Sequence, residues 1–191
     1  TVADDEDASA TDTFIVTVGN AAPVVNIGGD QLAVEGELVM LPPATFTDLG
    51  TLDTHTATIN WGDDTDDEVA AVTESPFGPP GSTLGMAGTI NASHVYADNG
   101  LYTVTLTVTD DDSAAATGSF TMEVTVDNVA PVAEAGEALV VDEGQVLEFV
   151  GSFTDAGTAD SHTATVAWGD GSVATGEVTE EPFGPPGSTL G

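Results

Sequence analysis

One stretch of the chain alternates strictly between apolar side chains and threonine. Its apolar members are Tyr102, Val104, Leu106 and Val108, and a threonine follows each of them. A period of two with many β-branched residues is typical of a strand that has one buried face. We therefore predict a strand over residues 102–110, preceded by a turn in which Gly100 supplies a positive φ angle. The Tyr102 ring is expected to be buried, with its hydroxyl bonded to the backbone near that turn.

Six further segments show short apolar runs bounded by Gly, Pro, Asn and Asp. The seven predicted strands cover residues 24–34, 37–47, 55–61, 68–74, 88–96, 102–110 and 119–127. No segment has the helical period, so the pattern predicts an all-β fold, an immunoglobulin-like β-sandwich of about seven strands. The core is predicted around Trp61, and its expected neighbours are Phe46, Ile59, Val104, Leu106, Phe120 and Val124.

The pattern repeats along the chain with a period of about 107 residues. Trp61-Gly62-Asp63 returns as Trp168-Gly169-Asp170, and the segment from Pro76 to Gly85 returns unchanged as Pro182 to Gly191. This period is one domain length, so the chain is predicted to be a tandem array. The predicted parts are the C-terminal end of a preceding repeat at 1–22, a complete repeat at 23–130 and the N-terminal part of a following repeat at 131–191.

The net charge of the chain restricts the classes of partner that it can bind. The 191 residues include 33 Asp and Glu but no Lys or Arg, which gives a formal net charge of −33. This balance excludes a nucleic-acid binder that neutralises phosphates and disfavours an anionic membrane surface. The chain has no Cys, so disulfides and thiolate metal sites are impossible. No apolar run reaches the roughly 18 to 20 residues of a membrane span, so we predict no membrane insertion.

Residues that could carry catalysis are few. The imidazole bases are His55, His94 and His162, and His162 is the copy of His55 in the next repeat. Gly81-Ser82 lacks the strand-turn-helix context of a nucleophile elbow, and a phosphate loop needs a Lys that the chain lacks. We therefore predict that the chain is not an enzyme. His94 is expected to form a structural hydrogen bond near the turn before Gly100, and His55 simply to open its strand.

The acidic side chains should gather at the two ends of the predicted sandwich, because its loops do. One end should bring together Asp48, Asp53, Asp110, Asp111, Asp112 and Asn20. The opposite end should collect Glu35, Glu37, Asp63, Asp64 and Asp98. Two carboxylates about 6 Å apart repel by roughly 2–3 kcal/mol at an effective dielectric constant near 20. Either a solvated acidic surface tolerates this repulsion, or a cation offsets it.

Calcium suits such a cluster, because it takes roughly six to eight oxygen ligands from flexible loops, whereas magnesium keeps more water. We predict a calcium site at the repeat junction. The predicted ligands are Asp48, Asp53, Asp110, Asp112 and Asn20, with Asp155 and Asp160 as copies in the following repeat.

Four motifs, taken together, carry a resemblance to a known family. They are Trp61-Gly62-Asp63, His94-x-Tyr96, the stretch from Gly100 to Asp110, and the junction Asn128-x-Ala130-Pro131. With these motifs the chain resembles, over essentially its whole length, the PKD domain in the tandem form common in large bacterial surface proteins. The resemblance implies an immunoglobulin-like sandwich used as a spacer or interaction module, often extracellular and in some members calcium-bound. The chain departs from the family at Asp64-Thr65, where Gly-Asp or Gly-Thr is usual, and in a longer loop at 75–88.

The predicted function is structural: a spacer module of a long, acidic, extracellular or cell-surface protein that forms a stalk or filament. The alternative is an adhesin-type binding module that recognises a polysaccharide or a cell-surface partner through its loops, which outward-facing Phe77 and Phe183 would favour. The expected partners are neighbouring repeats, further copies in a filament, and a glycan. We expect other copies of the array to complete the two outer repeats, either within one longer covalent chain or by strand exchange.

Overall fold

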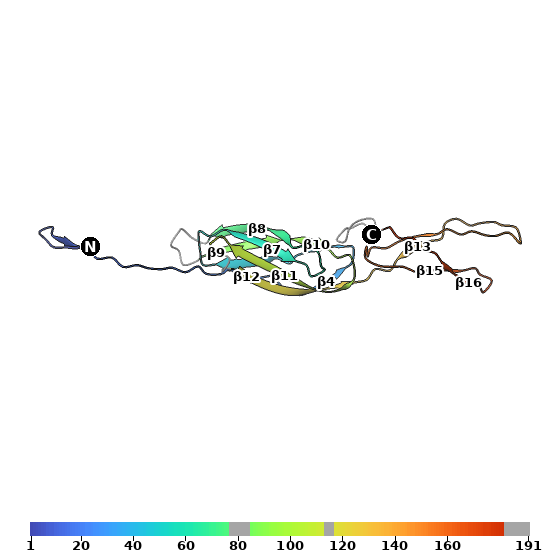
Figure 1. Cartoon of the computed structure of the whole chain (residues 1–191), viewed down its shortest axis with the longest axis horizontal. Coiled ribbons are helices and arrows are strands. Elements are labelled where there is room, and N and C mark those ends of the chain that lie inside the picture. Colours follow the sequence, from blue (N-terminus) through green and yellow to red (C-terminus); the bar gives the residue numbers. More distant parts are fainter. Residues whose placement is uncertain (77–84, 113–116, 182–191) are drawn as a thin grey trace.

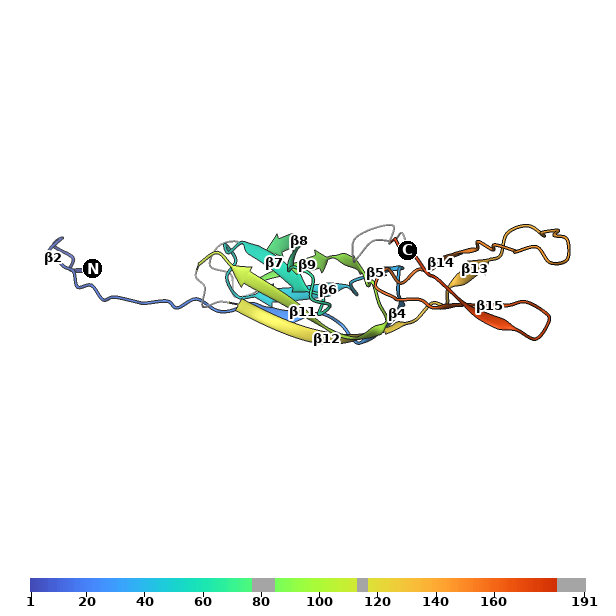
Figure 2. The same ribbon diagram turned by 45° about the vertical axis from the view of Figure 1, so that its right-hand side comes forward.

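The computed structural model describes residues 1–76, 85–112 and 117–181, with the backbone alone at 76 and 117–120. The parts of the chain follow one another along a line (Figures 1 and 2). Residues 1–20 extend from one end and carry a hairpin of β1 (Val2–Ala3) and β2 (Ser9–Ala10). A sandwich occupies the middle, and residues 131–181 extend from the other end. The described part contains no helix with the length and apolarity that a membrane crossing requires.

The sandwich has two layers joined by one strand. The first layer contains β3 (Val24–Asn26), β6 (Ala44–Asp48) and β9 (Met86–Asn91). The second contains β7 (His55–Asn60), β11 (Gly100–Asp110), β12 (Thr117–Asp127) and β4 (Gln31–Val34). The joining strand is β8 (Glu68–Pro76), which pairs with β7 up to Ala70 and with β9 from Ala71 onward. This arrangement confirms the predicted immunoglobulin-like β-sandwich.

Three strands that we predicted as continuous are split. The segment 24–34 changes layers near Gly28, where φ is 96°, so that β3 pairs with β6 while β4 runs parallel to β12. The segment 37–47 is broken at Pro42-Pro43, whose nitrogens carry no hydrogen to donate to a ladder, into β5 (Leu38–Met40) and β6. The segment 88–96 is broken at Ala92 into β9 and β10 (Ser93–Val95), and β10 pairs with β5.

The alternation in β11 matches the observed burial. Val104, Leu106 and Val108 have no exposed surface, and Leu106 lies opposite Ile59 of β7. Trp61 is also fully buried, within a core that includes the predicted neighbours Phe46, Ile59, Val104, Leu106 and Val124. The side chain of the sixth predicted neighbour, Phe120, lies outside the described residues.

The corner before β11 is closed by two stacked tyrosines. The Tyr102 hydroxyl donates to the Asp98 carbonyl at 2.9 Å, as predicted, but the ring is half-buried. The fully buried ring is that of Tyr96, which stacks on Tyr102 and whose hydroxyl donates to the Trp61 carbonyl at 3.1 Å. The predicted positive φ at Gly100 is wrong. Gly100 is needed for space instead, because a Cβ atom there would come within 3.1 Å of the Tyr102 ring.

Residues 131–181 form two separate two-stranded sheets. β13 (Val132–Glu134) pairs with β14 (Ser152–Thr154), and β15 (Ala164–Ala167) pairs with β16 (Val173–Gly176). Their Trp168 is 39% exposed, whereas its counterpart Trp61 is fully buried. The same motif therefore has two environments within one chain.

Candidate cation sites at the ends of the repeats

Three of the predicted ligands lie together at one end of the sandwich. Asp48 ends β6, Asp110 ends β11, and Asp53 lies in the loop between β6 and β7. Each offers a carboxylate oxygen, and the three oxygens lie within 4.8 Å of one another. Asp48 and Asp110 are almost completely buried, at 4% and 5% exposed. We call these three residues the single-repeat cluster, because all of them belong to the complete repeat.

Local hydrogen bonds hold the single-repeat cluster in place. Asp48 Oδ1 accepts from the Gly50 N–H at 2.7 Å. Asp110 accepts from the Asp112 N–H at 3.0 Å and from the Asn20 amide Nδ2 at 2.7 Å. Asn20 therefore lies beside the cluster, and it turns its amide nitrogen toward Asp110. Asp112 joins it through its backbone, and its exposed carboxylate is not among the three clustered ones.

The electrostatic effect of this crowding differs between neighbouring carboxylates. Burial, together with the charges of Asp48, Asp112 and Asp110, raises the pKa of Asp53 above its usual range. Asp111 shows the opposite shift, because the Thr54 N–H donates to its carboxylate at 2.8 Å and lowers its pKa. The Asp111 carboxylate thus binds the backbone of the loop at Thr54, while the Asp53 carboxylate is repelled by the other carboxylates of the cluster.

A buried histidine lies beside the cluster, and the sequence interpretation missed its role. His55 opens β7 as expected, but its ring lies between two carboxylates, 2.9 Å from Glu74 and 3.5 Å from Asp48. The His55 N–H also donates to the same Glu74 oxygen at 2.6 Å. The signal was present in the repeat, because His162 and Glu180 recur at nearly the same separation and form the same two bonds.

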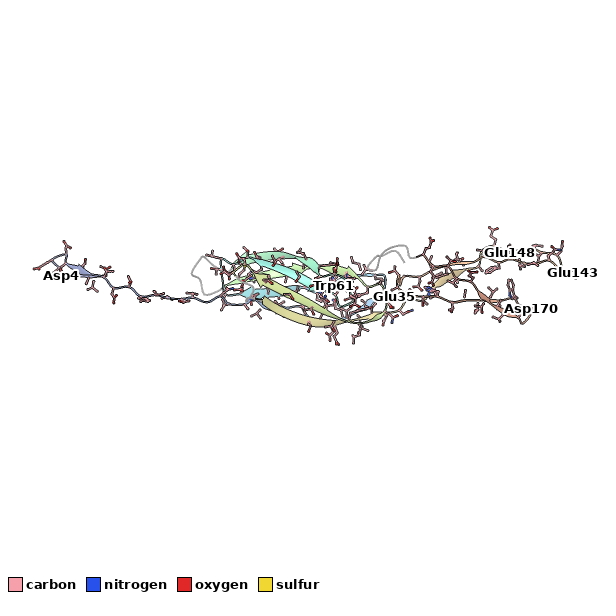
Figure 3. All side chains as sticks on the ribbon, viewed as in Figure 1. Asp4, Glu35, Trp61, Glu143, Glu148 and Asp170 are labelled. Atoms are coloured by element: carbon pink, nitrogen blue, oxygen red, sulfur yellow. The ribbon has the colours of Figure 1, made fainter. Side chains whose placement is uncertain are left out.

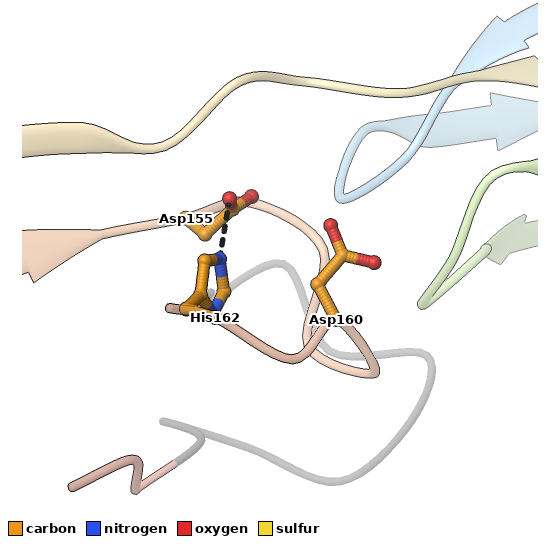
Figure 4. A group of neighbouring side chains, drawn as sticks. All are labelled: Asp155, Asp160 and His162. Carbon is orange, nitrogen blue, oxygen red and sulfur yellow. Dashed lines mark hydrogen bonds and ion pairs between the residues drawn. The ribbon is translucent and has the colours of Figure 1, made fainter. Parts of the chain in front are cut away.

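The following repeat forms a second copy of this loop (Figure 4). His162 Nε2 lies 2.9 Å from Asp155, and the Gly157 N–H donates to Asp155 at 3.0 Å. Although burial opposes the shift, these hydrogen bonds lower the pKa of Asp155. The hydrogen bond to Asp155 in turn raises the pKa of His162. Asp160 lies beside this pair, since ligand atoms of Asp155, Asp160 and His162 all lie within 4.8 Å of one another, and in Figure 4 its carboxylate points toward the turn between β4 and β5 of the complete repeat.

Asp160 meets two carboxylates from the far end of the complete repeat. Oxygens of Glu35, Asp98 and Asp160 lie within 4.8 Å of one another, and Glu35 has no exposed surface. We call these three residues the junction cluster. The sequence interpretation put Glu35 and Asp98 at this end of the sandwich but did not include them among the ligands. The reason is that no pattern within one repeat indicates how two repeats meet.

Desolvation and mutual repulsion shape the junction cluster. Burial raises the pKa of Glu35, against the effect of the Val129 N–H, and the charges of Asp160, Asp155 and Asp98 raise it further. Burial and the nearby charges of Asp98 and Asp155 likewise raise the pKa of Asp160. These carboxylates are held together by the fold although they repel each other when charged.

The third histidine has a structural role. His94 Nε2 lies 2.7 Å from the Asp63 carboxylate, and its ring stacks on Trp61 with the centroids 4.9 Å apart. The expected hydrogen bond thus exists, although its partner comes from the turn after β7. Hydrogen bonds to Thr65 and His94, opposed by burial, lower the pKa of Asp63.

Both ends of the complete repeat thus carry clustered carboxylates. The chemistry that they offer is that of hard oxygen ligands, which suits a hard cation.

Comparison with known proteins identifies the repeats. A sequence model of the family described as PKD domain matches residues 20–126 and again residues 128–188. No curated protein matches the chain. PKD domains are generally non-catalytic immunoglobulin-like modules, and they typically occur in extracellular or surface proteins.

Proposed function

We propose, because the chain belongs to the PKD domain family of structural or binding modules, that it serves as a spacer in an extracellular tandem-repeat protein. The second part of the proposal is that calcium stiffens the junctions between its repeats. The observation that carries this proposal is the direct contact between consecutive repeats along one line (Figures 1 and 2). Ala159 of the following repeat donates to the Ala97 carbonyl of the complete repeat at 3.0 Å. A spacer needs such contacts, because a bare linker would let the repeats bend freely.

The donor atoms at the repeat ends support calcium as the stiffening ion. One Glu35 oxygen, Oε2, is buried without a hydrogen-bond partner among the described residues. A buried carboxylate oxygen without a partner costs free energy, and a cation would offset that cost. The chain has no Lys or Arg that could supply the positive charge. Calcium accepts more protein oxygens than magnesium does, so it fits the crowded carboxylates better.

The adhesin alternative has less support. It depended on Phe77 and Phe183, which lie outside the described residues. Among the described side chains of the complete repeat, every aromatic ring is buried or half-buried. Recognition of sugars by exposed aromatic rings therefore has no platform in this part of the chain, and the spacer role is favoured.

The proposal is tested on the full chain by thermal unfolding and small-angle scattering, in calcium and in a chelator at constant ionic strength. Calcium that binds only the folded form should stabilise it by about 2.7 kcal/mol at a free concentration one hundred times the Kd. We also expect calcium to narrow the spread of interdomain arrangements while the particle remains elongated. A melting temperature and scattering curve that do not respond to calcium would contradict the metal part of the proposal, and a compact particle would contradict the spacer.

A matched pair of variants checks that the response comes from the clusters. Asp53→Asn removes one carboxylate from the single-repeat cluster, so it should reduce the calcium-dependent gain in melting temperature. Asp66→Asn makes the same change at an exposed aspartate outside both clusters, so it should leave the gain unchanged. Equal losses in the two variants would indicate a general charge effect.

A further inference from the structure

The junction cluster differs from the single-repeat cluster in how its members are supplied. Asp48, Asp53 and Asp110 all come from one repeat, whereas Glu35 and Asp98 come from one repeat and Asp160 from the next. Figure 3 places Glu35 where the complete repeat ends and residues 131–181 begin. A ligand held by the junction cluster would therefore touch both repeats at once.

Glu35 is fixed in the junction by its own repeat and by the linker. Its Oε1 accepts from the Val129 N–H at 2.5 Å, which ties the carboxylate to the segment that leads into the next repeat. Its Oε2 is buried and has no hydrogen-bond partner among the described residues, and a Glu35 carboxylate oxygen lies with those of Asp98 and Asp160. No donor among the described residues reaches this buried oxygen, which indicates that a bound species other than the protein satisfies it.

Two glycines allow the repeats to approach this closely. A Cβ atom on Gly157 would lie 3.0 Å from Glu35 Cδ and 2.7 Å from Asp160 Oδ2. A Cβ atom on Gly36 would lie 2.7 Å from the Ala156 carbonyl oxygen. The close packing of backbone from both repeats thus brings the carboxylates together, and no side chain separates them.

The charge needed to balance the junction cluster has few sources. The chain contains no Lys or Arg, so neither this chain nor a second copy can insert a permanent cation. The nearest histidine, His162, already lies 2.9 Å from Asp155 on one side of its ring and 2.9 Å from Glu180 on the other. The depression beside the cluster, about 440 Å³ in volume, is lined by Asp98, Asn128, Pro131, Asp155, Ala159, Asp160, Ser161 and His162. A small hard cation would supply the missing positive charge, and the oxygen atoms of the residues that line the depression could complete its coordination.

We infer that Glu35 and Asp98 of one repeat and Asp160 of the next bind a single calcium ion in a site that neither repeat holds alone. This inference rests on the proposed function and adds to it the complete repeat as a source of ligands for an ion held at Asp160. Because the ligands lie on two bodies, binding favours the arrangement of repeats in which all of them reach the ion. Calcium then sets the angle between repeats as well as the stability of each one.

The decisive variant is Glu35→Gln in the full chain, with Glu143→Gln as its matched control. Glu143 occupies the equivalent turn of the following repeat and is exposed. Titration of calcium chloride by calorimetry should give one ion at each cluster in the wild type. Glu35→Gln should weaken binding of the junction ion by about tenfold or more, since the loss of even an outer partner of a metal ligand costs roughly 10- to 100-fold in affinity. Glu143→Gln should bind as the wild type does.

A second readout separates a ligand from a merely structural glutamate. In Glu35→Gln the new side-chain carbonyl would still accept from the Val129 N–H, while its amide could donate to Asp98 or Asp160 and one negative charge would be lost. In chelator the variant should therefore melt higher than the wild type, yet gain less when calcium is added. A purely structural role predicts a lower melting temperature in both conditions, which would contradict the inference.

The outcomes distinguish the inference from the proposed function. If Glu35→Gln and Asp98→Asn both keep wild-type calcium binding while Asp53→Asn loses an ion, the two-repeat site is wrong and the single-repeat cluster alone binds. If the wild type binds no calcium, both proposals fail. Asp98→Asn also covers the case in which Glu35→Gln does not fold. The contact of Asp98 with Tyr102 is made by its backbone carbonyl and survives the substitution.

Discussion

Glu35 and Glu143 occupy equivalent turns in consecutive repeats, and their surroundings are opposite. Both turns place the next residue in the left-handed region, with φ of 72° at Gly36 and 79° at Gly144. Glu35 is fully buried at the junction, whereas Glu143 lies exposed at the tip of the molecule that is farthest from Asp4 (Figure 3). The local sequence thus sets the backbone of the turn. Burial and charge environment come from the neighbouring repeat.

The largest difference between the repeats should appear at the two tryptophans. Trp61→Ala should cost about 3–5 kcal/mol of unfolding free energy, because Trp61 is fully buried in the core. Trp168→Ala should cost about 1 kcal/mol or less, because Trp168 is 39% exposed. Urea unfolding of the full chain, followed by circular dichroism, measures both. Equal costs would mean that the second repeat is as well packed as the first.

A smaller difference should appear at the two turn glycines. Either Gly→Ala change places an L-residue at positive φ, which costs roughly 1–2 kcal/mol. At Gly144 no atom lies within 4 Å of the added Cβ, so nothing further is expected. At Gly36 the Cβ would meet Ala156 of the next repeat, and this overlap should cost about 1–3 kcal/mol more. Thermal unfolding gives the costs, and small-angle scattering should detect a changed interdomain arrangement for Gly36→Ala alone.

The smallest expected effect is a shift in the titration of His162. Asp155 raises its pKa, so the ion pair stabilises the folded loop fully below the unfolded pKa near 6.5 and less as pH rises through the raised folded value. The lowered pKa of Asp155 acts at the acid side, where its stabilisation is lost as pH falls through that value. In Asp155→Asn, the imidazole resonances of His162 in nuclear magnetic resonance spectra should titrate at lower pH than in the wild type. An unchanged titration would contradict the pairing.

What the sequence could predict depended on periodicity and on motifs within one repeat. The alternation of β11 identified its buried face, because side chains of period two all point to one layer. Loop positions likewise brought Asp48, Asp53 and Asp110 together, since the topology of a sandwich fixes which loops share an end. The two prolines at Pro42-Pro43 also indicate that the strand is split there. The apolar residues on both sides of them led to the prediction of one continuous strand.

The junction could not be predicted in the same way. The burial of Glu35 depends on Val129 at the end of its own repeat and on Ala156 and Gly157 of the next repeat, all of which follow it by roughly a hundred residues. A charged residue beside a turn glycine normally indicates an exposed position. Glu35 is buried only because the next repeat packs against its turn, and no local sequence pattern indicates that packing.

The parallel pairing of β4 with β12 has a mechanical consequence. These strands lie near the beginning and at the end of the complete repeat, and their register runs from Gln31 opposite Val124 to Val34 opposite Asp127. A force that pulls the two ends of the repeat apart draws β4 and β12 in opposite directions along their shared axis. The hydrogen bonds between them are then loaded in shear and must break together, whereas bonds peeled from one end break in sequence. A repeat built in this way resists extension at a pair of strands that lies close to the points where tension enters and leaves it.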